Sequence, residues 1–455
     1  MSTKAPDVYY HKDKYWILDG SQERYIALSD THITRRLKSI GLSGDSMKGH
    51  LSEIDVIKDD AVYKNTMDFV GVVAGRSVGV NTDKNGKRYL IPSKNQRVDA
   101  REGDFTYIRQ ILEGMLKEQL DYLYSWLHRS RSQLIEGDYK QGHILALAGQ
   151  SNCGKSLSAN AIIQPLLGKS GDPQKYLTGE TVFNADLVAS EVLIMDDKHG
   201  KRSAEARALL GQNLKWIAAG SNSVPCHPKG IDSYSVNPLW RCVICMNDDD
   251  QALGAFPPLG EGDCDSIGDK VLLLKCYKEI PLPFEGDNDQ STKLAAAIIR
   301  ELPAFAHFLD NYQIPDRIKS GSSRFGFNEF HNQELRGAIN QNSNERTLLS
   351  ATDEVFFNEG CDGGIVLDPS TQRYYWEGTA MEWSNLLRKN MKFGPQRTID
   401  ANLSYGDSAR AAGKWMGKME KIADGRIIKI KTSTERRWKI WAPIDEELNE
   451  SEGLF

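Results

Sequence analysis

The stretch Gly149-Gln-Ser-Asn-Cys-Gly154-Lys155-Ser156 matches the pattern G-x-x-x-x-G-K-[S/T] of a phosphate-binding loop. An apolar run over 143–148 precedes it, and residues 155–167 have the spacing of a helix that a following glycine can close. Glycines let backbone N–H groups turn toward phosphate oxygens, and the start of the helix adds positive potential. The stretch therefore predicts the nucleotide-binding loop of an α/β core.

Two side chains of this loop have predicted roles of their own. Lys155 is expected to reach the β- and γ-phosphates, and the Ser156 hydroxyl is expected to ligate Mg²⁺. The cofactors predicted on this basis are ATP and Mg²⁺. The residues expected to contact the nucleotide are Gly149, Gln150, Ser151, Asn152, Cys153, Gly154, Lys155, Ser156 and Leu157. The alternative is an ordinary glycine-rich turn between a strand and a helix.

Composition indicates a soluble multidomain protein. A length of 455 residues predicts about three domains, and 40% hydrophobic with 26% charged residues is ordinary for globular chains. The net charge of −5 argues against a chain that coats nucleic acid over its whole surface, although a local basic face remains compatible with it. No apolar run is long enough to span a bilayer, and no apolar secretion signal begins the chain. Seven cysteines among apolar neighbours favour a cytoplasmic location.

The order of predicted elements divides the chain into five parts. Strands alternate with helices from about 140 to 312, which is typical of a parallel α/β sheet. The final part contains helices followed by a basic hairpin, and this order suggests a winged helix. The predicted parts are a small α+β module (1–103), a helical collar (104–140), a P-loop ATPase domain (141–315), a linker (316–345) and a winged-helix-like domain (346–455).

A second motif places two acids at the end of an apolar strand. The run Glu191-Val-Leu-Ile-Met-Asp196-Asp197 is what a metal-binding strand of a P-loop ATPase needs. We assign Asp196 to the metal and Asp197 to the attacking water; the alternative is a solvated turn. A third strand, 239–246, ends in Asn247, whose amide can hydrogen-bond both water and γ-phosphate. A turn-forming asparagine is the alternative there.

The order of these three motifs resembles that of the superfamily 3 helicases, which are AAA+ ring motors, and particularly the phage and plasmid primase–helicase group. The resemblance covers about 140–312. It implies a homo-oligomeric ring, most simply a hexamer, that unwinds single-stranded or forked DNA and works with a separate primase. It also implies a hairpin within 224–234 that grips DNA in the ring channel through His227 and Lys229. A surface loop with a stray lysine is the alternative.

Two features depart from that family. It usually supplies an arginine finger soon after the sensor asparagine, yet no arginine occurs between Asn247 and Arg300. Lys270 is the nearest cation, although an ammonium lacks the planar fork that grips phosphate oxygens; Arg202 and Arg207 are the other candidates. Residues 1–95 contain no clear acid-rich metal cluster of a primase.

Basic residues and tryptophans interleave near the end of the chain. Cations on a helix and a wing would contact phosphates and supply affinity more than sequence choice. The residues predicted to bind DNA here are Lys414, Lys418, Arg426, Lys429 and Arg437. The alternative is a solvated basic face whose tryptophans belong to the core.

Three functions fit the sequence. The leading one is an ATP-dependent DNA helicase or translocase in the replication of a phage, plasmid or mobile element. The second is a P-loop ATPase switch that does not unwind DNA, for example in defence against mobile elements, with a winged helix that binds a partner. The third, a small-molecule kinase, is disfavoured because no arginine-rich lid follows the loop.

Overall fold

The computed structural model divides the chain into two compact units. The first comprises Met1–His199, Leu209–Asp249 and Asp269–Asn332, and the second comprises Gly200–Ala208, Asp250–Gly268 and Gln333–Phe455. The residues that the structure describes are 6–46, 48–83, 85–196, 204–219, 224–230, 232–259, 267–279, 289–320, 324–341, 344–358, 364–390, 405, 407–423, 425–431 and 435–443.

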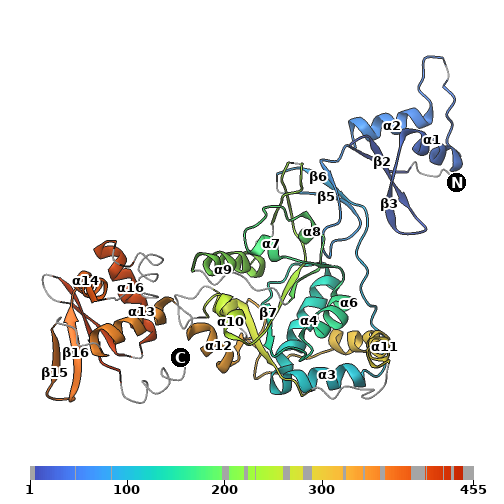
Figure 1. Cartoon of the computed structure of the whole chain (residues 1–455). Helices are drawn as coiled ribbons and strands as arrows, with labels where there is room; N and C mark the ends of the chain where they lie inside the picture. Colours follow the sequence, from blue (N-terminus) through green and yellow to red (C-terminus); the bar gives the residue numbers. More distant parts are fainter. Residues whose placement is uncertain are drawn as a thin grey trace. The chain divides into compact units, whose positions relative to one another are not determined.

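A six-stranded parallel sheet forms the centre of the first unit (Figure 1). Its order is β14-β13-β7-β12-β9-β8. The strands are β7 (Ile144–Gly149), β8 (Ser170–Gly171), β9 (Val192–Asp196), β12 (Arg241–Met246), β13 (Val271–Cys276) and β14 (Phe330–His331). Every residue of β7 and β12 is buried, as expected for strands covered on both faces. The predicted parallel sheet is confirmed, and β12 lies between the two motif-bearing strands.

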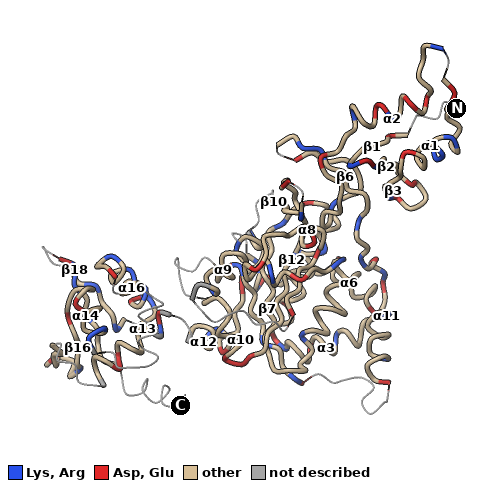
Figure 2. Tube along the Cα trace, turned by 45° about the horizontal axis from the view of Figure 1, so that its top comes forward, with Lys and Arg blue, Asp and Glu red and all other residues tan. Residues whose placement is uncertain are grey.

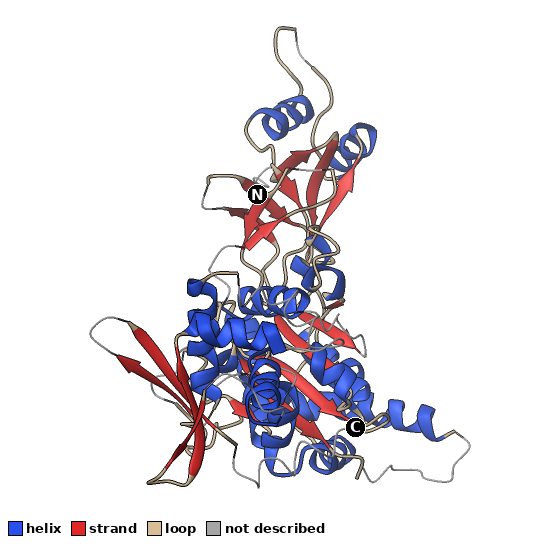
Figure 3. Cartoon of the chain, turned by 60° about the vertical axis from the view of Figure 1, so that its left-hand side comes forward, coloured by secondary structure: helices blue, strands red, loops and turns tan. Residues whose placement is uncertain are grey.

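The helix that follows the loop in sequence is continuous but not uniform. It consists of α5 (Lys155–Leu157), a π-helical turn (Ser158–Ile163) and α6 (Gln164–Leu167). Gly168, at φ 137°, ends it, as predicted. The predicted collar forms α3 (Thr106–Leu116) and α4 (Leu120–Glu136), which share one hydrophobic core with the sheet and with α11 (Gln290–Asp310). Figure 3 draws the helices of the chain in blue and its strands in red.

One buried side chain attaches the collar to the sheet. Gln119, in the short 3₁₀ turn Lys117–Gln119, accepts a hydrogen bond from the Lys275 N–H at 2.9 Å and donates to the Lys275 carbonyl at 3.0 Å. Beside it, the Tyr277 N–H donates to the Met115 carbonyl at 2.9 Å. The end of β13 is therefore held by α3 and the turn after it.

The N-terminal part of the first unit contains two small sheets. The first sheet joins β1 (Val8–His11), β2 (Lys14–Asp19) and β3 (Arg24–Leu28), and its core face packs with α1 (Asp30–Ser39) and α2 (Glu53–Tyr63). The second joins β4 (Phe69–Val70), β6 (Arg88–Ile91) and β5 (Gly79–Thr82). β5 and β6 form an antiparallel hairpin on either side of Asn85-Gly86. Helix α2 was not predicted.

Further elements surround the sheet. An antiparallel hairpin joins β10 (Val224–Cys226) to β11 (Tyr234–Val236). The helices nearby in sequence are α7 (Gln174–Leu177), α8 (Ala185–Val188) and α9 (Ala204–Ala219), the last of which spans the boundary between the units. In the part of the chain that the structure describes, no helix is long and apolar enough to cross a membrane.

The second unit has its own core. Its helices are α10 (Asp250–Ala255), α12 (Gln333–Gln341), α13 (Asn344–Asp353) with a π-helical extension (Glu354–Asn358), α14 (Ala380–Asn390) and α16 (Ala409–Ile422). The sheet has the order β15-β16-β18-β17, formed by Ile365–Asp368, Arg373–Gly378, Arg436–Trp441 and Ile427–Lys431. The basic hairpin predicted near the end of the sequence, β17–β18, therefore shares one sheet with β15 and β16. The winged-helix assignment stays a prediction.

Candidate nucleotide-binding site

The loop after β7 depends on two glycines. A Cβ at Gly149 would lie 2.2 Å from the Cys276 carbonyl oxygen on β13, so a side chain cannot be placed there without moving the strand. Gly154 has φ 91°, and Asn152 also adopts a positive φ of 63°. These conformations turn the backbone around the start of α5, as a loop that binds phosphate oxygens requires.

The Lys155 side chain lies inside this loop. It is 6% exposed, and its Nζ donates to the carbonyls of Gly149 at 2.7 Å and Gln150 at 2.8 Å. The same Nζ lies 3.4 Å from Oδ1 of Asn247, which follows β12. The sequence predicted that the third strand would carry an amide close to the loop, and the structure brings these two side chains together.

The two residues predicted to hold Mg²⁺ also contact each other. The Ser156 hydroxyl donates to Asp196 Oδ1 at 2.7 Å, so the first turn of α5 faces the end of β9. Asn160 Nδ2 donates to the other carboxylate oxygen at 3.1 Å and to the Ser156 carbonyl at 3.0 Å. A hydroxyl and a carboxylate beside a phosphate loop are oxygen ligands of the kind that Mg²⁺ prefers, so these residues fit the ion. Asp197 lies outside the described residues.

Asn160 was missed by the sequence reasoning. Its position four residues after Ser156 places it on the same face of the helix, and that spacing was the available indication. No known motif includes an amide at this position. The contact with Asp196 could not be predicted either, because it depends on how α5 packs beside the end of β9.

Cys153 and Cys276 form a buried thiol pair beside Lys155. A hydrogen bond from the Cys276 thiol lowers the pKa of Cys153, and Lys155, whose Nζ is 3.6 Å from Cys153 Sγ, lowers it further. Burial raises the pKa of Cys276. Negative charge is therefore favoured at the Cys153 sulfur rather than at Cys276.

The candidates for an arginine finger lie elsewhere. Lys270 is buried at the amino end of β13, whereas the loop lies at the carboxyl end of β7, so Lys270 does not face the loop of its own chain. Its ammonium is paired with Asp269, which also binds Arg324 at 3.0 Å. Arg207 is buried and donates to the Phe256 carbonyl at 3.0 Å. Arg202 lies outside the described residues.

The predicted DNA-gripping segment contains the β10–β11 hairpin. Lys229 is exposed in its turn, and His227 is partly buried. The buried Asn184 holds the base: its Oδ1 accepts from the His227 N–H at 2.7 Å, and its Nδ2 donates to the Pro225 carbonyl at 2.9 Å. Sequence reasoning missed Asn184, which lies about 40 residues away in the chain.

Contacts with the N-terminal part also brace the hairpin. Tyr234 stacks on Phe69 of β4 with ring centroids 3.9 Å apart, and its hydroxyl accepts from the Cys226 thiol at 3.0 Å. Lys87 Nζ donates to the Ser233 carbonyl at 3.2 Å.

The five basic residues predicted to bind DNA in the second unit differ in their surroundings. Lys414 and Lys429 are exposed on α16 and β17; Figure 2 marks the basic positions of this unit in blue. Lys418 binds Glu345 at 2.7 Å, and Arg437 binds Glu435 at 2.7 Å. Arg426 is buried and binds Asp353 at 2.5 Å, so a DNA phosphate would have to displace that carboxylate. Trp438 belongs to the core, as the alternative reading expected.

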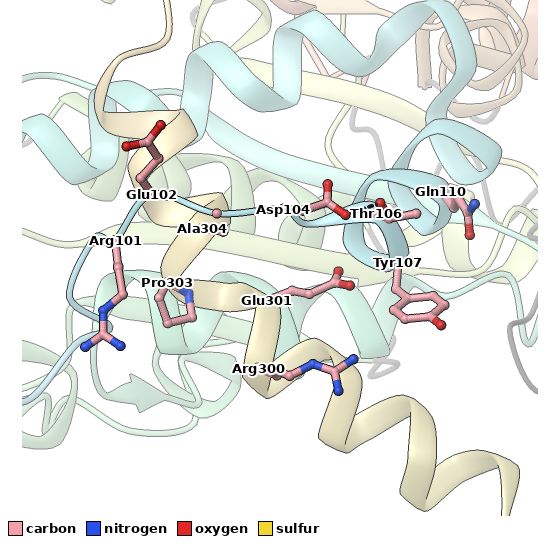
Figure 4. A pocket seen from close by; sticks show the side chains of 11 residues that line it. Arg101, Glu102, Asp104, Thr106, Tyr107, Gln110, Arg300, Glu301, Pro303 and Ala304 are labelled. Carbon is pink, nitrogen blue, oxygen red and sulfur yellow. Dashed lines mark hydrogen bonds between the residues drawn. The ribbon is translucent and has the colours of Figure 1, made fainter.

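A separate cavity of about 740 Å³ lies between residues 101–110 and α11 (Figure 4). Arg101 and Arg300 line it together with the acids Glu102, Asp104 and Glu301. Some of these residues also form hydrogen bonds that connect the segment 101–110 to α11. The Glu301 carboxylate accepts from the Ile108 N–H at 3.0 Å, and the Pro303 carbonyl accepts from the Arg101 N–H at 2.9 Å. The phosphate loop is not part of this cavity.

One protein-family model matches the part of the chain that contains the candidate site. Residues 147–256 match the model of a family of unknown function, DUF5906. That range contains Lys155, Asp196 and Asn247. No curated protein matches the chain.

Solved structures resemble almost the whole chain. An apo structure of the NrS-1 C terminal region is 11% identical, covers 96% of both chains and gives a TM-score of 0.51. An A form apo structure of that region is 12% identical, with 95% of each chain covered and a TM-score of 0.49. SCCmec type IV Cch, described as an active helicase, is 10% identical, with 96% of this chain and 91% of that chain covered and a TM-score of 0.40. The first likeness shows that the chain shares the fold of the NrS-1 C terminal region.

Proposed function

We propose that the chain is an ATP-hydrolysing motor that acts on DNA as a helicase or translocase. The observation that carries this proposal is the convergence of three motifs at one edge of the sheet. Lys155 contacts Asn247 at 3.4 Å, and Ser156 contacts Asp196 at 2.7 Å. Side chains from the loop and from the ends of β9 and β12 thus meet around the place where a nucleotide γ-phosphate would lie.

The residues have distinct roles in this proposal. Lys155 and the loop N–H groups bind the β- and γ-phosphates, Ser156 and Asp196 hold Mg²⁺, and Asn247 orients the γ-phosphate or the attacking water. Asp197 accepts a proton from that water or aligns it. When bound, Mg²⁺ neutralises charge on the phosphate oxygens. The chain's own contribution is to position and orient these groups.

The DNA-binding part of the proposal rests on the β10–β11 hairpin and on exposed cations of the second unit. In a ring of identical copies, most simply six, the hairpins would line the channel, and Lys229 would contact a phosphate of single-stranded or forked DNA. The ring would work beside a separate primase. Lys270 of a neighbouring copy would then be one candidate for the cation that completes the site.

The direct test replaces Lys155 by alanine. ATP hydrolysis is expected to fall to the background rate, because the variant lacks the ammonium that binds the transferred phosphoryl group. Lys140→Ala is the matched control, since it removes a lysine that pairs with Glu136 at 2.6 Å away from the loop. Hydrolysis by Lys155→Ala at the rate of the unmodified chain would show that the loop is not the nucleotide site.

A second candidate function is an ATPase switch that does not unwind DNA. The observation that favours it is the pairing of Lys418, Arg426 and Arg437 with carboxylates, which leaves fewer cations of the second unit for phosphates. Strand displacement from a fork and stimulation of ATP hydrolysis by DNA separate the two candidates. A motor shows both activities, whereas the switch hydrolyses ATP without displacing a strand.

A further inference from the structure

The β1–β2–β3 sheet has two different faces. Side chains alternate along a strand, so residues two apart point the same way. One face carries Val8, Tyr15 and Ile17, which are buried in the cluster beneath α1 and α2. The opposite face carries Tyr9, Trp16 and Tyr25, which are partly exposed and do not belong to that cluster. We call these three residues the aromatic face.

Two of the three rings are in contact, and the third belongs to a residue paired with one of them in the sheet. Tyr9 of β1 pairs directly with Trp16 of β2. Tyr25 of β3 pairs directly with Leu18 of β2. The ring centroids of Tyr9 and Tyr25 are 5.7 Å apart, in an edge-to-face arrangement. Leu18, on the same face, is 46% exposed. The face therefore combines partly exposed rings with one exposed aliphatic side chain.

One donor on this face has no acceptor. The indole N–H of Trp16 is buried, and no group among the described residues accepts a hydrogen bond from it. Buried indole N–H groups usually find a partner, because an unsatisfied donor costs free energy. The ring of Trp16 is partly exposed although its N–H is buried, so a ligand on the aromatic face would contact the ring rather than this donor.

The charges around the face indicate what kind of ligand this is. Lys14 is exposed two residues before Trp16 and so shares its face. Arg88 lies close enough to Tyr9 to act on its hydroxyl, and exposed Lys94 follows Pro92, whose carbonyl accepts from the Tyr25 N–H at 2.8 Å. Asp7 is the acid that acts on both Tyr9 and Tyr25. Lys14 and Arg88 are therefore cations placed beside the rings, and Asp7 is an acid placed there.

We propose that the aromatic face binds single-stranded nucleic acid by stacking unpaired bases on Tyr9, Trp16 and Tyr25. Aromatic rings bordered by cations are the combination that holds single strands, because every base has a face that stacks and every phosphate is anionic. A duplex buries its base faces within its own stack and cannot use the rings. The site lies outside the nucleotide-binding residues, so it extends the proposed motor function without depending on ATP hydrolysis.

The first experiment measures binding of a fluorescein-labelled oligo(dT) to the full chain without ATP. Trp16→Leu and Tyr25→Leu keep an apolar side chain but lack the ring, and each is expected to weaken binding roughly 5- to 150-fold. Trp16→Phe is expected to retain most of the affinity. The control is Tyr63→Leu, which removes a tyrosine that is 83% exposed on α2 and should leave binding unchanged. Oligo(U) in place of oligo(dT) distinguishes RNA from DNA as the preferred strand.

The outcomes are decisive in both directions. Unchanged affinity of both leucine variants, or an equal loss in Tyr63→Leu, overturns the proposal. Photocrosslinking of the unmodified chain to an oligonucleotide that contains 5-iodouracil avoids any question of variant folding. Crosslinks at Tyr9, Trp16 or Tyr25 support the site, and crosslinks confined to the β10–β11 hairpin and the second unit refute it. ATP hydrolysis without DNA should be the same in all these variants, so failure here leaves the nucleotide site untouched.

Discussion

At the scale of single residues, the carboxylate of Asp196 is held by two different partners. Ser156 binds one oxygen and Asn160 the other, and both partners come from the helix that begins at the phosphate loop. Such contacts fix the direction in which a metal ligand points, and losing one typically weakens metal affinity or activity 10- to 100-fold. The orientation of this carboxylate is therefore a property of α5 and the π-helical turn as much as of β9.

Asn160→Ala is expected to lower ATP hydrolysis about tenfold at limiting Mg²⁺ and to raise the Mg²⁺ concentration needed for half-maximal rate, because Asp196 loses one orienting donor. A Mg²⁺ titration of the ATPase rate measures this. Asn213→Ala serves as the control, since its amide donates to the Leu177 carbonyl at 2.9 Å on a different helix. An unchanged Mg²⁺ requirement would mean that Asp196 is oriented without Asn160.

His143, directly before β7, gives a prediction for pH. Burial lowers the pKa of its ring to about 3, from an ordinary value of 6.5. Between these values the unfolded chain binds a proton that the folded chain excludes, so stability is complete above pH 6.5 and falls by ~1.4 kcal/mol per pH unit below it. His143→Leu should remove this part of the acid sensitivity in urea unfolding at pH 7 and pH 5, whereas His32→Leu, at an exposed position, should not. Equal pH dependence in His143→Leu and the unmodified chain would contradict the assignment.

At the scale of elements, the β10–β11 hairpin joins a firmly held base to an exposed turn. Asn184 and the Tyr234–Phe69 stack fix the base, while Lys229 points into solvent. If the proposed ATPase activity moves the core, a firmly held base would pass that movement on to the turn, because the hairpin strands would move with the core rather than bend.

Replacing His227 and Lys229 together by alanine is expected to uncouple the motor. Basal ATP hydrolysis should persist, since the nucleotide site is unaltered, while unwinding of a fork and stimulation by DNA disappear. The salt dependence of DNA binding should also become less steep. Lys175→Ala, at an exposed lysine on α7, is the control. Fork unwinding by the double variant would remove the hairpin from the mechanism, and loss of basal hydrolysis would instead place it in the nucleotide site.

Local sequence patterns predicted most elements but few of the contacts between them. The loop, β9 and β12 were predictable because each combines a buried run with a motif at its end. Gln119 and Asn184 were not, because their partners lie 156 and 43 residues away and depend on how helices pack on the sheet. Helix α2 was missed because acidic residues interrupt its apolar spacing, so its helical periodicity is weak.

At the scale of the whole molecule, two units with separate hydrophobic cores are expected to respond separately to core substitutions. Trp383 is fully buried in the second unit and donates to the Thr352 hydroxyl at 3.1 Å, while Trp126 is buried in the first and donates to the His143 carbonyl at 2.7 Å. Substitution of each tryptophan therefore tests the stability of one core.

Trp383→Ala should destabilise the second unit by about 3–5 kcal/mol through the cavity that it leaves. Urea unfolding monitored by circular dichroism is expected to show a first transition at low urea, in which the second unit unfolds. Nucleotide binding should be retained until a second transition at higher urea. Trp126→Ala should instead destabilise the first unit, so that nucleotide binding is lost at a lower urea concentration than in the unmodified chain. A single transition that shifts equally in both variants would show that the units unfold together.

The contact of Gln119 with β13 also has a consequence for solubility. β14 pairs with β13 only at Leu272 and Leu273, so the outward N–H and carbonyl of Lys275 would otherwise be open to another strand. The Gln119 carboxamide occupies both groups, as a neighbouring strand would. Unpaired sheet edges are where proteins join into aggregates by adding strands from other molecules. This glutamine therefore leaves neither backbone group of Lys275 free to pair with a strand from another molecule.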